Sequence, residues 1–293
     1  MHGLGTIVVG IDFSPASAAA LTQAIRIAAF GQASVRPVHV IETLVVIDVN
    51  APLVPMVADA TQELINSSQQ RWAEFAARVP GAEKLKLEVE VNSSVAAISR
   101  RVGDAHAGLL VMGVEGVTKS KGAGPVASGA VQRAGTDVLL VQQGHSGPFT
   151  TVVVAVDFSP TSKRALEQAV RFATQDGAGL HIVHAYASPW GHKLNKPGEV
   201  PELEKALRAG MEQKLREFAA PLSHEMQYLK PVYTLVQHDT AAHGISAYAR
   251  QVGADLVIMG KRGQTNLRDL LLGSTAERLL RTAPCSVLAV RPG

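Results

Sequence analysis

The sequence predicts an α/β fold with two tandem domains, each a five-stranded parallel sheet wound on both faces by helices in a Rossmann-like way. Hydrophobic residues make up 46% of the 293 residues but aromatic residues only 4%, so the cores must be aliphatic. Buried parallel strands have this aliphatic character. Short aliphatic runs also alternate with amphipathic segments, which is typical of βαβ units. The third observation is that the sequence repeats itself.

The repeat sets the domain organisation. Residues 6–15 (TIVVGIDFSP) match residues 151–160 (TVVVAVDFSP), at an offset that the following helix keeps. A copy this long indicates gene duplication, so we expect domains over 1–145 and 146–293. The Gly-, Ser- and Pro-containing segment 142–149 (QQGHSGPF) is predicted to be the linker.

The second copy shows the expected elements in order. Residues 152–157 (VVVAVD) are an aliphatic strand, and a helix follows over 160–174. Ser159 is placed to cap that helix, with Pro160 at its first position. The pattern then predicts a strand over 179–185, a helix over 202–219, a strand over 230–237, a helix over 241–252, a strand over 255–260, a helix over 275–282 and a last strand over 286–290.

In the first copy, the amphipathic segment 61–78 predicts a helix with Trp72 and Phe75 on its apolar side. Packing on the core is the expected role of that side, and a groove for a partner is the alternative. Right-handed crossovers bring the loops after strands 1 and 4 of each copy to the carboxyl edge of its sheet, where such sheets bind ligands.

A glycine-rich loop follows the fourth strand of the second copy. Gly260-Lys-Arg-Gly263 is separated by nine residues from Gly273-Ser274, which stands just before the last helix. Glycines allow backbone N–H groups to approach a phosphate, and a helix N-terminus attracts an anion. Lys261 and Arg262 could neutralise phosphate charge. The alternative is structural, because Ser274-Thr-Ala-Glu277 has the form of a capping box.

This G-2x-G-9x-G-S loop, the Asp-Phe-Ser-Pro strand end and the closing APCSVLAVR resemble the universal stress protein family, over nearly the whole chain. The resemblance implies a tandem member with an adenine nucleotide alpha hydrolase-like fold that binds ATP, and Mg²⁺ could accompany the ATP. It implies Asp157 near the adenosine or the metal, and Ala185 facing the adenine through its backbone. The expected nucleotide-binding residues are Asp157, Ala185, Met259, Gly260, Lys261, Arg262, Gly263, Gly273, Ser274 and Thr275. Asp157 could instead simply accept N–H bonds from the turn that follows it.

The loop of the first copy departs from this pattern. Gly113 and Gly116 keep the opening pair, but Glu115 would repel a phosphate. Pro125 stands in the place of Ser274, and proline has neither a hydroxyl nor an N–H group. We therefore expect weak nucleotide binding there, or none. Asp12 and Val40 still match the residues expected on the adenine side of the second copy. Lys119 and Lys121 compensate part of the lost positive charge, but not the geometry of the loop.

Other function classes find little support. The net charge of +3 is weakly basic and does not imply nucleic acid, and no apolar run is long enough to span a membrane. The single cysteine, Cys285, fits a buried position and a reducing cytoplasm. His238, Asp239 and His243 are close in sequence but match no zinc spacing. His39 and His184 end equivalent strands and are expected to be structural.

The first hypothesis is thus an ATP-binding regulatory protein of the stress response, with the nucleotide held mainly in the second domain. No base to activate water is evident, so hydrolysis would be slow at most. The alternatives are an interaction scaffold without nucleotide and a slow ATPase or phosphotransfer protein. The family resemblance also implies pairing of strands 138–141 and 287–290 into a pseudo-dimer within the chain. A homodimer and an unidentified protein partner are further possibilities.

Overall fold

The computed structural model describes residues 4–42, 54–114, 123–187, 200–263 and 272–293, and for 54–58, 200 and 201 the backbone alone. Residues Met1–Glu115 and Gly124–Ser146 form one compact unit, and Gly147–Gly293 belong to a second. No helix in these ranges is both long and apolar enough to cross a membrane.

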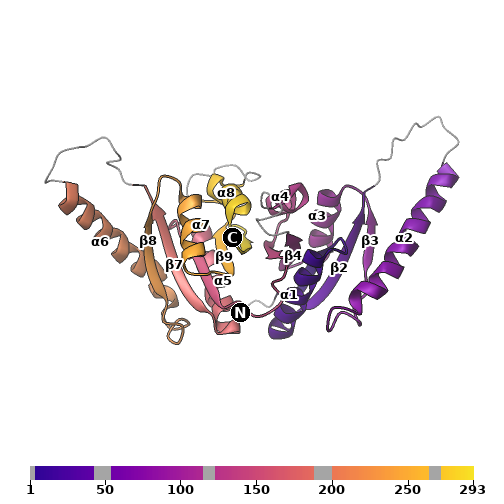
Figure 1. Cartoon of the computed structure of the whole chain (residues 1–293), viewed down its shortest axis with the longest axis horizontal. Coiled ribbons are helices and arrows are strands. Elements are labelled where there is room, and N and C mark those ends of the chain that lie inside the picture. Colours follow the sequence, from indigo (N-terminus) through magenta and orange to yellow (C-terminus); the bar gives the residue numbers. More distant parts are fainter. Residues whose placement is uncertain (1–3, 43–53, 115–122, 188–199, 264–271) are drawn as a thin grey trace. The chain divides into compact units, whose positions relative to one another are not determined.

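The first unit is a parallel sheet in the order β3-β2-β1-β4-β5 (Figure 1). This order and right-handed crossovers place α1 and α2 on one face and α3 and α4 on the other. The observed contacts of α1 with the strands, and of α3 with α4, agree with this placement of the helices. The elements are β1 Thr6–Ile11, α1 Pro15–Gly31, β2 Ser34–Ile41, α2 Val54–Ala76, β3 Glu88–Val91, α3 Ser94–Asp104, β4 Leu109–Val114, α4 Pro125–Arg133 and β5 Asp137–Gln142.

The second unit repeats this topology, with the parallel order β8-β7-β6-β9-β10. Here α5 and α6 lie on one face, and α7 packs against α8 on the other (Figure 1). The predicted fold class is confirmed for both units. The elements are β6 Thr151–Ala155, α5 Pro160–Asp176, β7 Gly179–Tyr186, α6 Val200–Ala219, a short 3₁₀ turn Ala220–Leu222, β8 Val232–Gln237, α7 Ala241–Gln251, β9 Leu256–Gly260, α8 Ser274–Thr282 and β10 Ser286–Val290.

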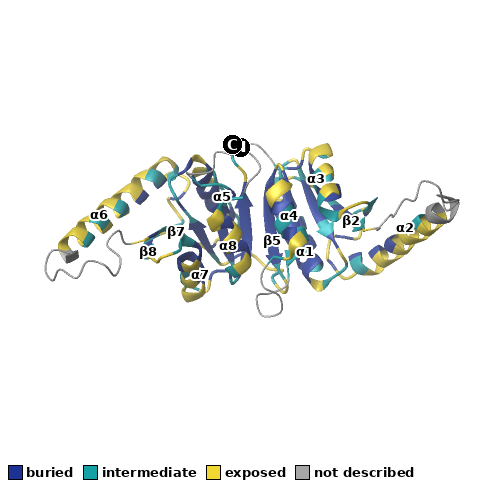
Figure 2. Ribbon diagram, turned by 90° about the horizontal axis from the view of Figure 1, so that it is seen from above, coloured by how far each residue is buried: buried dark blue, intermediate teal, exposed yellow. Residues whose placement is uncertain are grey.

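The central strands are buried on both faces because helices cover both sides of each sheet. Figure 2 shows this burial as dark blue strands between helices with exposed outer faces. The predicted packing of α2 is confirmed, since Trp72 is buried and donates a hydrogen bond to the carbonyl of Leu85. Cys285 is also buried, as expected, and burial raises the pKa of its thiol to about 12.

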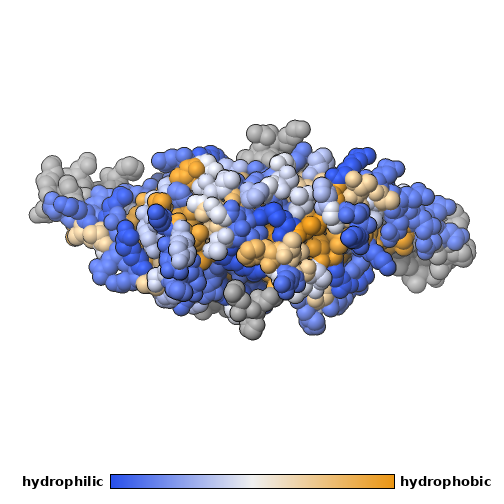
Figure 3. All heavy atoms as spheres, turned by 90° about the horizontal axis from the view of Figure 1, so that it is seen from below, coloured by the Kyte–Doolittle hydropathy of each residue, from blue (hydrophilic) through white to orange (hydrophobic). Residues whose placement is uncertain are grey.

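The surface is mainly hydrophilic on the face drawn in Figure 3, with smaller apolar groups between. Single exposed apolar side chains are ordinary in a folded protein. The large apolar residues that are exposed in the described ranges are Phe30, Leu64, Leu203, Tyr228 and Val232.

The second unit begins earlier than the expected linker allowed. Phe149 is fully buried and packs edge-on against Phe172 of α5, with 5.9 Å between ring centroids. Its backbone N–H is bound by the carboxylate of Asp176 at 2.7 Å. At the other end, Gln142 is still part of β5. The Gly and Ser residues of the expected linker lie between the end of β5 and the start of β6, and the aromatic residue at its end belongs to the core of the second unit.

Candidate functional site

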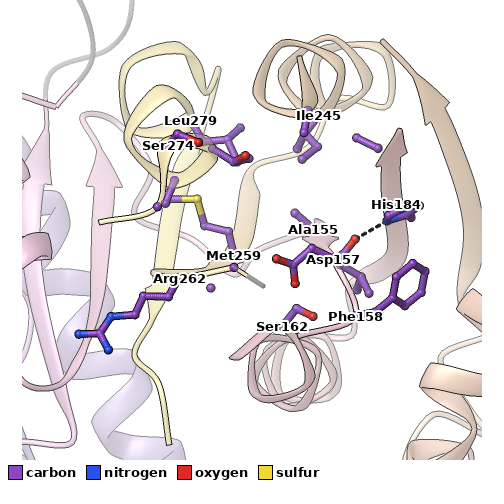
Figure 4. A pocket seen from close by; sticks show the side chains of 18 of the residues that line it. Ala155, Asp157, Phe158, Ser162, His184, Ile245, Met259, Arg262, Ser274 and Leu279 are labelled. Atoms are coloured by element: carbon purple, nitrogen blue, oxygen red, sulfur yellow. Dashed lines mark hydrogen bonds between the residues drawn. The ribbon is translucent and has the colours of Figure 1, made fainter. Parts of the chain in front are cut away.

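The candidate site lies where β6 and β9 end side by side, since Val154 is the register partner of Ile258. A cavity of about 820 Å³ opens at this carboxyl edge (Figure 4), within the usual size range of small-molecule sites. It is lined by Ala155, Val156, Asp157, Phe158, Ser162, His184, Ala185, Leu207, Met211, Lys214, Ala241, Ile245, Met259, Gly260, Arg262, Gly263, Leu272, Gly273, Ser274, Thr275, Ala276, Glu277 and Leu279.

Nine of the ten expected nucleotide-binding residues are in this lining, and Lys261 is the exception. Only 5% of Lys261 is exposed. Its backbone joins three segments, because its N–H donates to the carbonyl of Val290 at 2.7 Å and its carbonyl accepts from the N–H of Gly273 at 2.8 Å. Lys261 thus holds together the two ends of the glycine-rich loop.

Arg262 lines the cavity but directs its charge elsewhere. In Figure 4 its guanidinium points away from Asp157 and from the centre of the cavity. The sequence placed Lys261 and Arg262 together as cations beside a phosphate. In the structure Lys261 is not part of the lining, and the guanidinium of Arg262 points away from the cavity.

Asp157 combines the two roles that the sequence left open. One carboxylate oxygen, Oδ1, accepts the N–H of Ser159 at 3.0 Å and so orders the turn into α5. The other oxygen, Oδ2, faces Gly263 closely enough that a Cβ on this glycine would lie 2.6 Å from it. Gly263 therefore leaves room for the loop to lie against the carboxylate.

The first glycine of the loop has a packing role. A Cβ on Gly260 would lie 2.9 Å from Cγ2 of Thr161 on α5. A Cβ on Gly113 would lie 2.2 Å from the backbone of Ala16 on α1 in the same way. Neither glycine has a positive φ. The close approach of helix and strand explains why both copies keep this glycine, although only one keeps the rest of the loop.

The structural alternative for Ser274, a capping box at α8, is wrong. Gly273, with φ −64° and ψ 144°, is the N-cap, and Ser274 is already the first helical residue. Glycine cannot supply a side-chain cap, and Glu277 pairs instead with Arg281 at 2.7 Å. The hydroxyl of Ser274 therefore does not cap α8. Among the residues that the structure describes, no side chain caps this helix N-terminus where it lines the cavity, which leaves its N–H groups available to an anion.

Phe158 stands at the opposite wall in an unusual conformation. Its φ of 64° is left-handed, which is costly for a residue with a bulky side chain. The ring packs against His184 with 4.5 Å between centroids and edge-on against Phe218 of α6 at 5.6 Å. The Nζ of Lys214 lies 4.3 Å from the ring centroid. His184 is fixed by its Nδ1, which donates to the carbonyl of Val156 at 2.7 Å.

The first unit repeats this aromatic cluster residue by residue. Phe13 has φ 65°, and its ring lies 4.6 Å from His39, 5.7 Å from Phe75 and 4.3 Å from the guanidinium of Arg71. His39 Nδ1 bonds the carbonyl of Ile11 at 2.8 Å. The expectation that His39 and His184 are structural agrees with these bonds, because each ring fixes the end of a neighbouring strand.

The first unit differs at the start of its last helix. Gly124 is the N-cap of α4 and Pro125 its first residue, so the helix begins without the N–H and hydroxyl of Ser274. Asp12 keeps the role of Asp157 in the turn, accepting from Ser14 N–H at 2.9 Å. Burial raises the pKa of Asp12, but hydrogen bonds from Ser14 and Ser17 outweigh it and hold this pKa below its usual value. Residues 115–122, with Glu115, Gly116, Lys119 and Lys121, lie outside the described residues.

Sequence reasoning missed the wall that α6 contributes. Leu207, Met211 and Lys214 line the cavity from this helix. Leu207 and Met211 are four residues apart, so they share one face of the helix. That spacing was visible in the sequence, but it could not tell which edge of the sheet this face would cover.

The two histidines before and in α7 lie near the cavity without forming a metal cluster. His238 Nδ1 accepts the N–H of Thr240 at 3.1 Å, and His243 Nδ1 bonds the hydroxyl of Thr240 at 2.9 Å. In the described ranges, no group of three His, Cys, Asp or Glu side chains is placed to hold a metal ion.

Comparison with known proteins gives one consistent family. The model of the universal stress protein family matches residues 3–142 and again 148–291. A universal stress protein of Thermus aquaticus is 34% identical over 145 residues, covering 49% of this chain and 99% of its own. One from Mycolicibacterium smegmatis is 26% identical over 301 residues, covering 98% of this chain and 97% of its own.

A solved structure has the same architecture over the full length. The universal stress protein of Archaeoglobus fulgidus DSM 4304 superimposes with a TM-score of 0.65 and 21% identity, covering 98% of each chain. This likeness supports the fold, and the family match covers both halves. The chain belongs to the universal stress protein family and carries two of its domains in tandem.

Proposed function

We propose that this chain is a nucleotide-responsive regulatory protein of the stress response that binds ATP in its second unit. The observation that carries the proposal is the cavity itself. Residues from the ends of β6, β7 and β9 and from the start of α8 meet around it, and nine of them are those that the glycine-loop resemblance implied.

The chemistry of the walls suits an adenine nucleotide. The uncapped N-terminus of α8 offers N–H groups and partial positive charge to phosphates. Met259 and Ile245 supply apolar surface for a base. Asp157 is an acceptor for ribose hydroxyls, or a ligand for a Mg²⁺ ion that accompanies the phosphates. Gly263 leaves the space that this arrangement needs.

The residues that line the cavity suit a protein that holds ATP for regulation better than one that hydrolyses it. A hydrolase would need a base within reach of the attacking water. Asp157 already accepts a backbone hydrogen bond with one oxygen, and His184 uses Nδ1 to bond a carbonyl. We therefore expect ATP to be held, with slow hydrolysis at most.

The test replaces Ser274 by the residue at the equivalent position of the first unit. Ser274→Pro gives the second unit the residue that the first has at Pro125. Proline is well tolerated at the first position of a helix, and the ψ of 144° at Gly273 suits a following proline. Calorimetric titration with Mg–ATP should find one site in the wild type. Ser274→Pro should weaken it by about tenfold or more, since an N–H and a hydroxyl are lost.

Asp12→Ala is the matched control, because Asp12 makes the same turn in the first unit that Asp157 makes in the second. It should leave ATP affinity unchanged, whereas Asp157→Ala should reduce it. Equal loss in both variants, or two equal sites in the wild type, would contradict the assignment to the second unit. Absence of binding by folded, nucleotide-free protein would leave the scaffold function in its place.

A further inference from the structure

The cavity has a second positively charged position on the side of α6. Among the described lining residues, four carry a formal charge: Asp157, Lys214, Arg262 and Glu277. Arg262 points away from the cavity (Figure 4), and Glu277 pairs with Arg281. Asp157 and Lys214 are therefore the charges that a ligand would meet.

A rigid platform holds the ammonium of Lys214. Its Nζ lies 4.3 Å from the centroid of the Phe158 ring. That ring cannot easily move, because the left-handed backbone at Phe158 and contacts with His184 and Phe218 fix it. A cation over an aromatic face keeps its outward N–H groups for another acceptor.

The helix does not neutralise this charge. The neighbouring carboxylates on α6 have other partners, since Glu212 pairs with Arg208 at 3.4 Å and Glu217 accepts from Gln213 at 2.8 Å. Lys214 has no ion pair within the described part of the chain. An anionic group in the cavity could therefore gain its full attraction.

The two anion-attracting positions lie apart. Figure 4 shows Ser274 at the start of α8 and Phe158 on opposite sides of the cavity, with Asp157 between them. From this geometry we infer that Lys214 binds a second anionic group of the ligand, so that the preferred ligand is an adenine nucleotide with a second phosphate on its ribose. The inference rests on the proposed function, because the first phosphate is the one at α8.

A purely structural role for Lys214 makes a different prediction. In the first unit, the guanidinium carbon of Arg71 lies 4.3 Å from the centroid of the Phe13 ring, although the glycine-rich loop differs there. A cation at this place can therefore also serve only to hold its helix against the aromatic ring. Pinning alone would affect the stability of the protein without ligand. It would not distinguish a nucleotide with one phosphate from one with two.

The experiment compares adenosine 5′-monophosphate with adenosine 2′,5′- and 3′,5′-bisphosphate by calorimetric titration of the full chain. In the wild type, at least one bisphosphate should bind about fivefold more tightly than the monophosphate, a modest gain because Lys214 is exposed to solvent. Salt should reduce this advantage. Lys214→Met keeps the packing stem and should abolish the advantage, Lys214→Arg should retain it, and Arg71→Met should leave it unchanged.

The outcomes separate the two proposals. If the monophosphate binds and neither bisphosphate gains affinity, or if Lys214→Met keeps the gain, the inference about Lys214 is wrong and the nucleotide site stands. If Lys214→Met and Arg71→Met lower the melting temperature alike and change no affinity ratio, both cations only pin their helices. If no nucleotide binds, the proposed function fails, and this inference fails with it.

Discussion

At the scale of single residues, the second unit depends on Asp255 in a way that the first does not. Its carboxylate accepts from the N–H and the hydroxyl of Thr150, both at 2.7 Å, and from the N–H of Thr151 at 3.0 Å. These bonds fasten the start of β6 to the start of β9. In the first unit Gly108 stands before β4 at this place, and it is bound through its backbone N–H to the carbonyl of Thr6.

We expect Asp255→Ala to lower the free energy of unfolding of the second unit by about 1–3 kcal/mol. The reason is that three donors lose a charged acceptor and two of them are backbone groups. Thermal denaturation followed by circular dichroism measures the change. Asp255→Asn keeps one acceptor oxygen and should cost less, so an equal loss in both variants would argue against the hydrogen bonds as the cause.

At the scale of elements, the two sheets stabilise equivalent outer strands with different chemistry. In the first unit Glu88 of β3 pairs with Arg36 of β2 at 2.6 Å and with Arg101 of α3 at 3.3 Å. In the second unit Tyr248 of α7 takes the central place. Its hydroxyl bonds His181 Nδ1 of β7 at 2.9 Å and Thr234 Oγ1 of β8 at 3.0 Å. The first unit thus uses ion pairs at this place, whereas the second unit uses hydrogen bonds to a tyrosine hydroxyl.

This difference predicts a pH dependence at β7 and β8 that comes from His181 and has no counterpart at β2 and β3. Burial lowers the pKa of His181. Its Nδ1 bonds the hydroxyl of Tyr248, which in turn bonds Thr234. As the pH falls below about 6.5, the unfolded chain takes up a proton at His181 before the folded chain does. The free energy of unfolding of the second unit should therefore fall between pH 7 and pH 5.5.

Hydrogen exchange of β7 and β8 at the two pH values measures this effect, after correction for the intrinsic exchange rates. His181→Gln removes the titrating group and should flatten the dependence. The arginines at the same place in the first unit stay charged throughout, so Arg36→Gln is the matched control and should leave the pH response of β7 unaltered. An equally steep response in His181→Gln would assign it to another group.

At this scale the sequence predicted some features of the structure correctly and others wrongly. The strands were predictable because burial on both faces makes them continuously aliphatic, and the repeat gave each a second copy. The Ser159 cap was predictable because Pro160 marks the first helical position, and it is confirmed by the bond from Ser162 N–H at 3.1 Å. The capping box at Ser274 failed because Gly273 is the N-cap, so the helix begins at Ser274, one residue earlier than the pattern suggested.

The site was predictable on the side where local motifs build it. The loop glycines and Asp157 are close in sequence to the strand ends that position them. The α6 wall was not predictable, because whether Leu207 and Lys214 reach the cavity depends on how a long helix packs on the sheet. The left-handed backbone conformation of Phe158 was also not predictable, because an aromatic residue in a sequence gives no sign of a positive φ.

At the scale of the whole molecule, duplication gives two units with the same fold and a different residue, Pro125 or Ser274, at the start of the last helix. Each has its own buried core and its own aromatic cluster. The cluster at Phe13 persists in the unit where Pro125 stands in the place of Ser274. Its persistence indicates that the cluster supports the fold of each unit.

A nucleotide should consequently stabilise one unit and not the other. At a ligand concentration 100 times the dissociation constant, binding adds about 2.7 kcal/mol to the unit that holds the site. Hydrogen exchange with and without Mg–ATP should slow amides of β6, β9 and α8, whereas β1, β4 and α4 keep their rates. Ser274→Pro should remove the protection. Equal protection of α4 would mean that the first unit binds nucleotide despite Pro125, and that the asymmetry between the two loops does not decide where the ligand goes.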